Sequence, residues 1–395
     1  TILKCLSPMR HVRRDHVAEA PLITKVEIQK CSRKIKDIGR ETGSGTPTYL
    51  PGAEMDQSFY MTRVFTDKGI IGEYPLAADI SSAAELMLGR NALERGFFYA
   101  EYARYPTNLL GAVDTILWDI AGKFHSASVS ELIGGFRKKL PAYASTMNGG
   151  VTGGLSTPES YADFAEQCKE IGYKGFKIHP YPRPVLQDHI DAILALGKRV
   201  GDSMDLMLDS FCFYQTFADA LKVGYTCDEA GFFWYEDPYF DGGSTEYGHR
   251  KLREYIKTPL LQGEKVHSIQ QKVNLLLANA TDFIRGGIPA NGVTGTMKLA
   301  GAAEALGVDV EIHGSGPAQR HVMSAIANSN YYEMVWVHPD VECLQMTNEI
   351  YTNYADGLDL VDADGNVDIP QGAGYGVEYD WKYISSHSTG KVVID

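Results

Sequence analysis

The sequence predicts an α/β fold: a (β/α) barrel of the modified TIM type, preceded by a smaller α+β unit. The first observation is periodicity, because short apolar runs alternate with amphipathic stretches about every 20 to 30 residues after Leu140. The runs lie at residues 175–178, 205–209, 232–236, 260–264, 283–285, 309–313 and 331–333. The second observation is that these runs are almost continuously apolar, as is typical of strands buried on both faces of a parallel sheet.

The region before the barrel has the alternating pattern of antiparallel strands. Apolar residues recur among polar ones from Ile23, and two later strand segments flank a turn, at residues 59–65, 67–69 and 70–74. A polar segment at residues 39–52 is rich in glycine and proline, which predicts a mobile loop. We therefore expect a small antiparallel unit with a loop attached to it.

Helical periodicity dominates residues 81–124, with Ser81 as the predicted N-cap. These patterns divide the chain into a solvated extension at residues 1–22, an α+β unit at 23–140 and a barrel at 141–340.

Composition excludes several classes of protein. The 395 residues carry 37 Lys and Arg against 50 Asp and Glu, a net charge of −13, and an acidic chain without a basic stripe disfavours nucleic acid as a partner. The hydrophobic fraction of 44% is ample for a core, and the chain has no apolar stretch near the roughly 20 residues of a membrane span. Six cysteines without a Cys-x-x-Cys pair favour free thiols and a cytoplasmic location.

Charged residues stand at or just past the ends of the apolar runs. They are Lys177, Asp209, Glu236, Glu264, His313 and Glu333. Because the carboxyl ends of barrel strands form one rim, we expect these side chains to converge. The alternative to a shared site is that each acidic residue caps the next helix or pairs with a surface lysine.

Three carboxylates, from Asp209, Glu236 and Glu264, would repel one another unless a cation lay between them. An oxygen-only donor set favours Mg²⁺ over zinc or copper. We therefore predict Mg²⁺ as the cofactor.

Six short motifs stand out along the chain. They are the helix segment Ala-Val-Asp-Thr-Ile-Leu-Trp-Asp-Ile-Ala-Gly-Lys at 112–123, Leu-Ile-Gly-Gly at 132–135, Leu-Asp at 208–209, Tyr-Glu-Asp-Pro at 235–238, Gly-Glu at 263–264 and Asn-Gly-Val-Thr-Gly at 291–295. Together they resemble the motifs of the enolase superfamily, and of its mandelate racemase-like branch in particular. The resemblance implies that residues 23–140 and the C-terminal tail 341–395 form an α+β capping domain over the barrel. It makes the loop at 39–52 the candidate lid.

The resemblance also implies roles for individual residues. Lys177 matches a lysine that polarises the substrate carboxylate. His179 stands where a second lysine would be a base, and an imidazole can still transfer protons. His313 matches the base on the other face, and Glu333 matches a glutamate that hydrogen-bonds the substrate carboxylate in its protonated form. Apart from the resemblance, Arg285 is a candidate for a distal substrate oxygen, although an arginine at a barrel rim is also a common ion-pair partner.

One part of the family pattern is missing. The resemblance implies an aspartate that orients His313 from the sixth strand, and counting back from Asn291 puts that position at Gly286. Asp282 is a poor substitute, because four strand residues would displace it by about 13 Å.

These features predict a Mg²⁺-dependent dehydratase that converts a pentonate or hexonate to a 2-keto-3-deoxy acid. His313 or His179 would take the α-proton, and a diacid substrate would need Arg285 or Arg183 for its second carboxylate. A racemase or epimerase, and a non-catalytic sugar-acid binder, are the alternatives. The resemblance also implies a homo-oligomer.

Overall fold

The computed structural model describes residues 19–40, 47–104, 109–150, 153–179, 181, 185–341 and 348–395. Several expectations fall partly or wholly outside these ranges. They concern most of the extension at 1–22, the middle of the segment at 39–52, residues 342–347 of the C-terminal tail, Arg183, and the cysteines Cys5 and Cys343.

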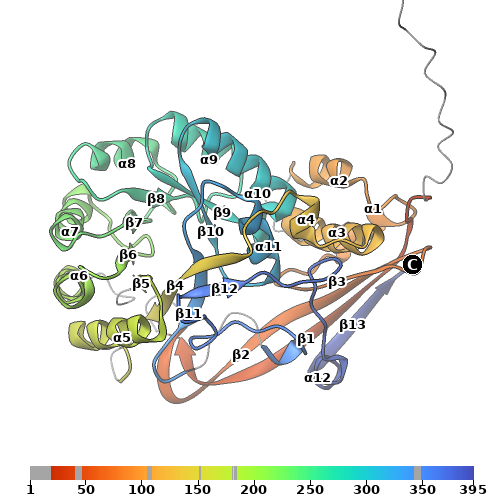
Figure 1. Ribbon diagram of the computed structural model, residues 1–395, viewed down its shortest axis with the longest axis horizontal. Coiled ribbons are helices and arrows are strands. Elements are labelled where there is room, and N and C mark those ends of the chain that lie inside the picture. The colour runs from red at the N-terminus through yellow and green to blue at the C-terminus, as the bar shows by residue number, and fades with distance from the viewer. Residues whose placement is uncertain are drawn as a thin grey trace, which may run out of the picture.

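Among the described residues, eight parallel strands form the predicted barrel (Figure 1). In chain order they are β4 (Lys139–Asn148), β5 (Gly175–His179), β6 (Asp205–Asp209), β7 (Trp234–Glu236), β8 (Leu260–Gln262), β9 (Phe283–Gly287), β10 (Asp309–His313) and β11 (Tyr332–Val337). Strands β4 to β10 pair with their chain neighbours, and β11 returns to pair with β4. Between β10 and β11, Glu311 accepts a hydrogen bond from the amide of Asn330, and Glu333 accepts one from Gly314.

In the part of the chain that the structure describes, seven helices separate the barrel strands, which confirms the strand–helix periodicity. They are α5 (Pro158–Ile171), α6 (Leu186–Val200), α7 (Phe217–Ala230), α8 (Glu246–Arg253), α9 (Ile269–Leu277), α10 (Ile288–Ala305) and α11 (Pro317–Ala325). Local sequence sets their ends: the hydroxyl of Thr216 caps α7, and Gly231 ends that helix in the left-handed conformation. None of the described helices is long and apolar enough to cross a membrane.

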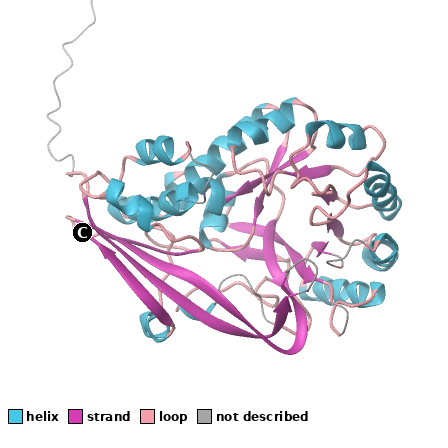
Figure 2. Ribbon diagram, turned by 180° about the vertical axis from the view of Figure 1, so that it is seen from behind, coloured by secondary structure: helices cyan, strands magenta, loops and turns pink. Residues whose placement is uncertain are grey.

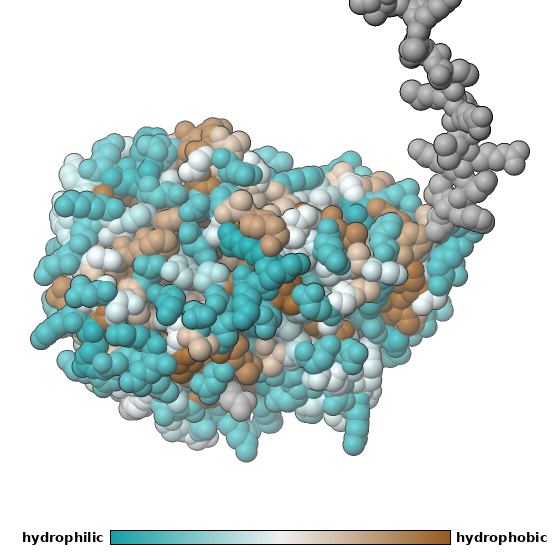
Figure 3. All heavy atoms as spheres, in the orientation of Figure 1, coloured by the Kyte–Doolittle hydropathy of each residue, from teal (hydrophilic) through white to brown (hydrophobic). Residues whose placement is uncertain are grey.

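The N-terminal strands build an antiparallel sheet beside the barrel (Figure 2). Its strands are β1 (Ile23–Arg40), β2 (Pro47–Thr66), β3 (Ile71–Leu76) and, from the far end of the chain, β13 (Ser388–Ile394), which pairs with β1. The remaining elements are α1 (Ser81–Met87), α2 (Arg95–Tyr102), α3 (Leu109–His125), α4 (Val129–Leu132), η1 (Asn348–Ile350), β12 (Asn366–Asp368) and α12 (Trp381–Ser386). On the face drawn in Figure 3, hydrophilic side chains predominate and apolar ones gather in small areas.

Two local predictions were wrong. The described part of segment 39–52 is strand, because Gly39 pairs with Thr48 across the ends of β1 and β2. Ser81 is the first residue of α1 and not its N-cap, since its own amide and hydroxyl donate to the carboxylate of Asp79.

The tryptophan-containing helix α3 ties the α+β unit to the barrel. Asp114 accepts hydrogen bonds from the amide and the hydroxyl of Thr294, at 2.8 and 2.6 Å, and Trp118 Nε1 donates to the same hydroxyl at 2.9 Å. Gly292 has a φ of 64°, and a Cβ there would lie 2.4 Å from Asp114 Oδ2. These motif residues therefore determine how α3 packs against α10.

Candidate active site

Asp209, Glu236 and Glu264 meet at the carboxyl ends of the central barrel strands. Each offers one oxygen, and these three atoms all lie within 4.8 Å of one another. Asp209 ends β6, Glu236 ends β7, and Glu264 follows β8 by two residues. Three carboxylate oxygens in this arrangement match the donor set of a hard divalent cation such as Mg²⁺.

Lys177 lies beneath these carboxylates with no exposed surface. Its Nζ is 3.0 Å from Glu236 Oε2, 2.8 Å from Glu333 Oε1 and 3.5 Å from Asp209 Oδ2. Burial lowers the pKa of an ammonium group, but Glu236 and Glu333 outweigh it and raise the pKa of Lys177 well above its ordinary value. Lys177 is therefore a permanent positive charge inside the barrel.

Arg285 is an ion-pair partner, which is one of the two roles considered for it. Its side chain points into the barrel and is fully buried, with Nε 2.5 Å from Glu236 Oε1 and Nη2 2.8 Å from Glu236 Oε2. Nη2 also donates to the hydroxyl of Tyr143 at 3.1 Å. These contacts make Arg285 an ion-pair partner that orients Glu236, and a contact with a substrate oxygen stays a prediction.

His179 is tied to a proposed metal ligand. Its Nε2 lies 3.1 Å from Asp209 Oδ2, and its Nδ1 lies 2.7 Å from the carbonyl oxygen of Thr146. Both ring nitrogens therefore face acceptor atoms, and the ring is 3% exposed. This geometry fixes the orientation of the imidazole.

His313 is the more open of the two histidines, with 31% of its side chain exposed. Its Nε2 lies 3.6 Å from Glu264 Oε2. Because β5 precedes and β10 follows the three strands that carry the carboxylates, His179 and His313 flank those carboxylates on opposite sides.

The strand position beside His313 is not the one predicted for the missing aspartate. A Cβ at Gly286 would lie 2.8 Å from Ile312 and 3.2 Å from Thr296, in the layer between strands and helices. Gly287 is the register partner of His313, and a Cβ there would meet nothing within 4 Å. The position beside His313 is therefore Gly287, which carries no carboxylate either.

Glu333 is buried among hydrogen-bond donors and positive charges. Ser145 Oγ donates to its Oε1 at 2.9 Å, and the amide of Gly314 donates to its Oε2 at 2.7 Å. Burial raises the pKa of a carboxyl group, but Lys177 and Arg285 outweigh it and hold the pKa of Glu333 well below its ordinary value. Lys177 and Arg285 therefore favour the anionic form of Glu333, and its protonation beside a substrate carboxylate stays a prediction.

Sequence reasoning missed two residues of the site. Asn148 ends β4 and pairs in register with His179, and its buried amide nitrogen and oxygen have no hydrogen-bond partner among the described residues. No signal revealed it, because β4 is rich in small and polar residues. Lys265 forms an ion pair with Glu264, and its place directly after Glu264 in the sequence was an available signal.

Lys265 helps to keep the adjacent carboxylate ionised. Burial raises the pKa of Glu264, but His313 and Lys265 outweigh it and lower that pKa to about 2. The carboxylate is thus available as a metal ligand at neutral pH.

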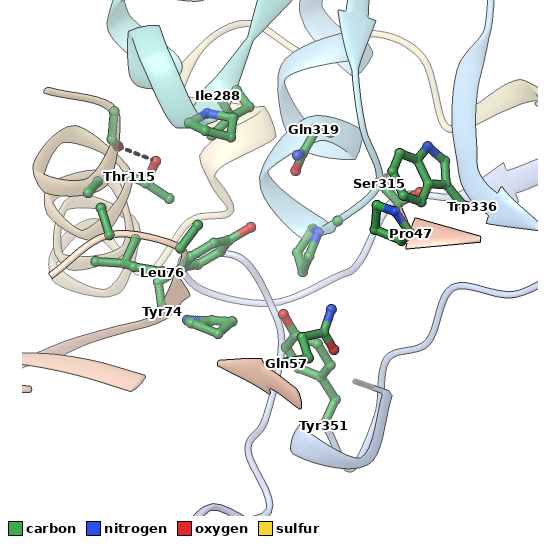
Figure 4. A pocket seen from close by; sticks show the side chains of 18 of the residues that line it. Pro47, Gln57, Tyr74, Leu76, Thr115, Ile288, Ser315, Gln319, Trp336 and Tyr351 are labelled. Carbon is green, nitrogen blue, oxygen red and sulfur yellow. Dashed lines mark hydrogen bonds between the residues drawn. The ribbon is translucent and has the colours of Figure 1, made fainter. Parts of the chain in front are cut away.

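A cavity of about 350 Å³ lies between the barrel rim and the α+β unit (Figure 4). Its wall reaches the site at Ser315, which follows His313 by two residues and donates to the carbonyl oxygen of Glu333 at 2.7 Å. The wall also includes Trp336, whose ring centroid is 6.1 Å from that of His179. Neither the three carboxylates nor His179 and His313 are among the described residues that line the cavity, which extends from Ser315 and Trp336 toward β3 and α3.

Comparison of this chain with known proteins finds a matching family and several similar proteins. A profile described as "Enolase C-terminal domain-like" matches residues 160–383, more than half of the chain. D-gluconate dehydratase of Thermoproteus tenax is 26% identical over 264 residues, which are 62% of this chain and 52% of that protein. Arabinonate dehydratase of Saccharolobus solfataricus is 26% identical over 233 residues, 57% of this chain and 60% of that protein. The aligned region thus spans between half and two thirds of these curated relatives.

A solved structure matches almost the whole chain. The crystal structure of D-glucarate dehydratase from Agrobacterium tumefaciens complexed with magnesium superposes with a TM-score of 0.82 at 27% identity. The match covers 93% of this chain and 99% of that one. The similarity therefore includes the α+β unit as well as the barrel.

Proposed function

This chain belongs to the enolase C-terminal domain-like family, and we propose that it is a Mg²⁺-dependent dehydratase of a monocarboxylic sugar acid, a pentonate or hexonate. The convergence of Asp209, Glu236 and Glu264 carries the proposal. The named sugar-acid dehydratases among the relatives support the substrate class. When bound by these carboxylates, Mg²⁺ would stabilise the negative charge that develops on the substrate carboxylate as the α-proton leaves.

Lys177 supplies a second, permanent positive charge next to the proposed metal site. A preorganised charge in a water-poor interior stabilises a developing anion more strongly than the same charge in water. Two residues act as positioning residues in this proposal. Glu333 pairs with Lys177, and Arg285 pairs with Glu236.

The two histidines divide the proton transfers. His313, the more exposed one, takes the α-proton from C2, and His179 on the other side donates a proton to the hydroxyl that leaves C3. The C3–O bond breaks, one water departs, and the resulting enol becomes the 2-keto-3-deoxy acid. Asn148, beside His179 and with an unpartnered amide, is placed to bind a substrate hydroxyl.

The test is incubation of the purified protein with Mg²⁺ and a panel of pentonates and hexonates, followed by assay of 2-keto acid. Formation of keto acid that depends on Mg²⁺ and stops with EDTA is the expected result. No keto acid from any member of a stereochemically complete panel would refute the dehydratase.

The flanking histidines also favour a second candidate, a racemase or epimerase of an α-hydroxy acid, because two bases on opposite faces suit inversion. Deuterium from solvent appearing at the α-carbon without keto acid identifies that reaction. Binding of acids without either reaction would identify a non-catalytic binder.

A further inference from the structure

A second cavity, of about 440 Å³, opens between α2 and the loop that follows β8. Its described wall comes from the end of α2, the start of α3, residues 265–271 and the first turn of α10. Figure 1 shows α2, α9 and α10 in the upper part of the view. None of these described wall residues also lines the cavity of Figure 4. A space of this size can hold a small organic molecule.

The described wall of this second cavity carries positive charge and no acidic side chain. Its charged residues are Arg104 and Lys265, and His267 lines the same space. Arg104 Nη2 lies 3.1 Å from Glu101 Oε1, and Lys265 pairs with Glu264. A guanidinium offers several N–H donors, and an exposed ion pair is weak, so Arg104 can still bind a ligand. The wall therefore favours an anion, on a chain whose net charge is −13.

The nine-residue helix α9 begins in this wall. The hydroxyl of Ser268 accepts a hydrogen bond from the amide of Gln271 at 3.4 Å. The amides of Ile269 and Gln270, in the same first turn, have no partner within the helix. Such amides, together with the partial positive charge of a helix start, bind phosphate and carboxylate groups. The helix start and the cationic side chains thus favour the same class of ligand.

A buried amide in the same wall lacks a partner. Asn291, in the first turn of α10, is 1% exposed, and its Nδ2 donates to the carbonyl oxygen of His267 at 2.7 Å. Because this bond fixes the orientation of the amide, Oδ1 is left as an acceptor, and it has no donor among the described residues. Both Asn291 and His267 line the cavity. A ligand hydroxyl would supply the donor that Oδ1 lacks.

We propose that this cavity binds a phosphorylated polyol of the size of a hexose phosphate. The phosphate group accepts from the first-turn amides of α9 and from Arg104, and a hydroxyl group of the ligand donates to Asn291 Oδ1. Donors that come from separate elements surround a tetrahedral phosphate better than a planar carboxylate. The binding site is separate from the three carboxylates of the proposed metal site and does not depend on the proposed reaction.

Calorimetric titration of the full chain with glucose 6-phosphate, in Mg²⁺ and again in EDTA, tests the site. We expect one molecule to bind with the same Kd in both buffers, because the wall contains none of the three carboxylates. In EDTA, glucose should release no heat, and gluconate should bind at least about tenfold more weakly than glucose 6-phosphate. Absence of binding, binding that EDTA abolishes, or equal binding of gluconate would overturn the proposal.

Gln270→Glu places a negative charge in the wall at the second residue of α9. A glutamate suits the first turn of a helix, so Tm should not fall, while Kd for glucose 6-phosphate should rise about tenfold. Gln187→Glu is the matched control, since Gln187 is the second residue of α6, is exposed and lies outside the cavity. Arg104→Ala, at an exposed residue, should also raise Kd about tenfold. A Kd that stays at the control value in both wall variants would refute the site.

Discussion

Replacing Arg285 by methionine tests the charge arrangement beneath the proposed metal site. Arg285 Nε and Nη2 lie 2.5 and 2.8 Å from the two oxygens of Glu236, and both side chains are fully buried. Methionine keeps an apolar stem but leaves Glu236 with less neutralising charge. Removing one partner of a buried ion pair costs about 3–5 kcal/mol of unfolding free energy. Because Lys177 remains 3.0 Å from Glu236, we expect the lower end, about 3 kcal/mol.

The assay is urea denaturation of the parent and of Arg285→Met, in EDTA and in Mg²⁺. Mg²⁺ should restore more stability to the variant than to the parent, because the ion supplies positive charge that Glu236 has lost. Arg199→Met removes an exposed arginine that pairs with Asp163 and Glu166, and should have little effect. A loss for Arg285→Met no larger than that of this control would refute the reasoning.

Three further changes test other parts of the account. Lys177→Met should lower kcat by at least about 100-fold, as measured by steady-state kinetics. Calorimetry should show that the three carboxylates of this variant still bind Mg²⁺. An unchanged kcat would contradict the proposed role of Lys177. Asn148→Ala should raise KM about tenfold with an unchanged Tm, and an unchanged KM would show that the amide does not meet the substrate. Glu311 is buried, and burial raises its pKa to about 7 although Asn330 donates to it. The folded state therefore holds this proton more tightly than the unfolded chain, so stability falls as pH rises from about 4.5 to about 7, by about 3 kcal/mol. Glu311→Gln should remove this part of the pH dependence in urea denaturation at pH 5 and pH 8, and an identical pH profile for parent and variant would count against it.

The barrel could be predicted because its strands are buried on both faces, which leaves continuous apolar runs in the sequence. The first strand, β4, escaped because Ala142, Ala144, Ser145 and Thr146 give it little apolar character, although they are buried. Its burial comes from partners far away in the sequence, which a local pattern does not contain.

The meeting of the three carboxylates followed from strand order alone, since residues at strand ends share one rim. The direction in which each side chain points did not follow from strand order. Arg285 and Gly286 are neighbours, yet position 285 faces the barrel interior and position 286 faces the helices. An error of one residue in counting along the strand therefore assigns a residue to the wrong face. The ionised state of Glu333 likewise depends on Lys177, which lies on a strand that is distant in the sequence.

A crystal structure of the protein grown with Mg²⁺ and a sugar acid tests the central claim most directly. We predict one ion with an oxygen of Asp209, Glu236 and Glu264 each at about 2.0–2.1 Å, and the carboxylate of the acid on the same ion. Absence of the ion at saturating Mg²⁺, or an ion held elsewhere with these three side chains turned apart, would contradict the account.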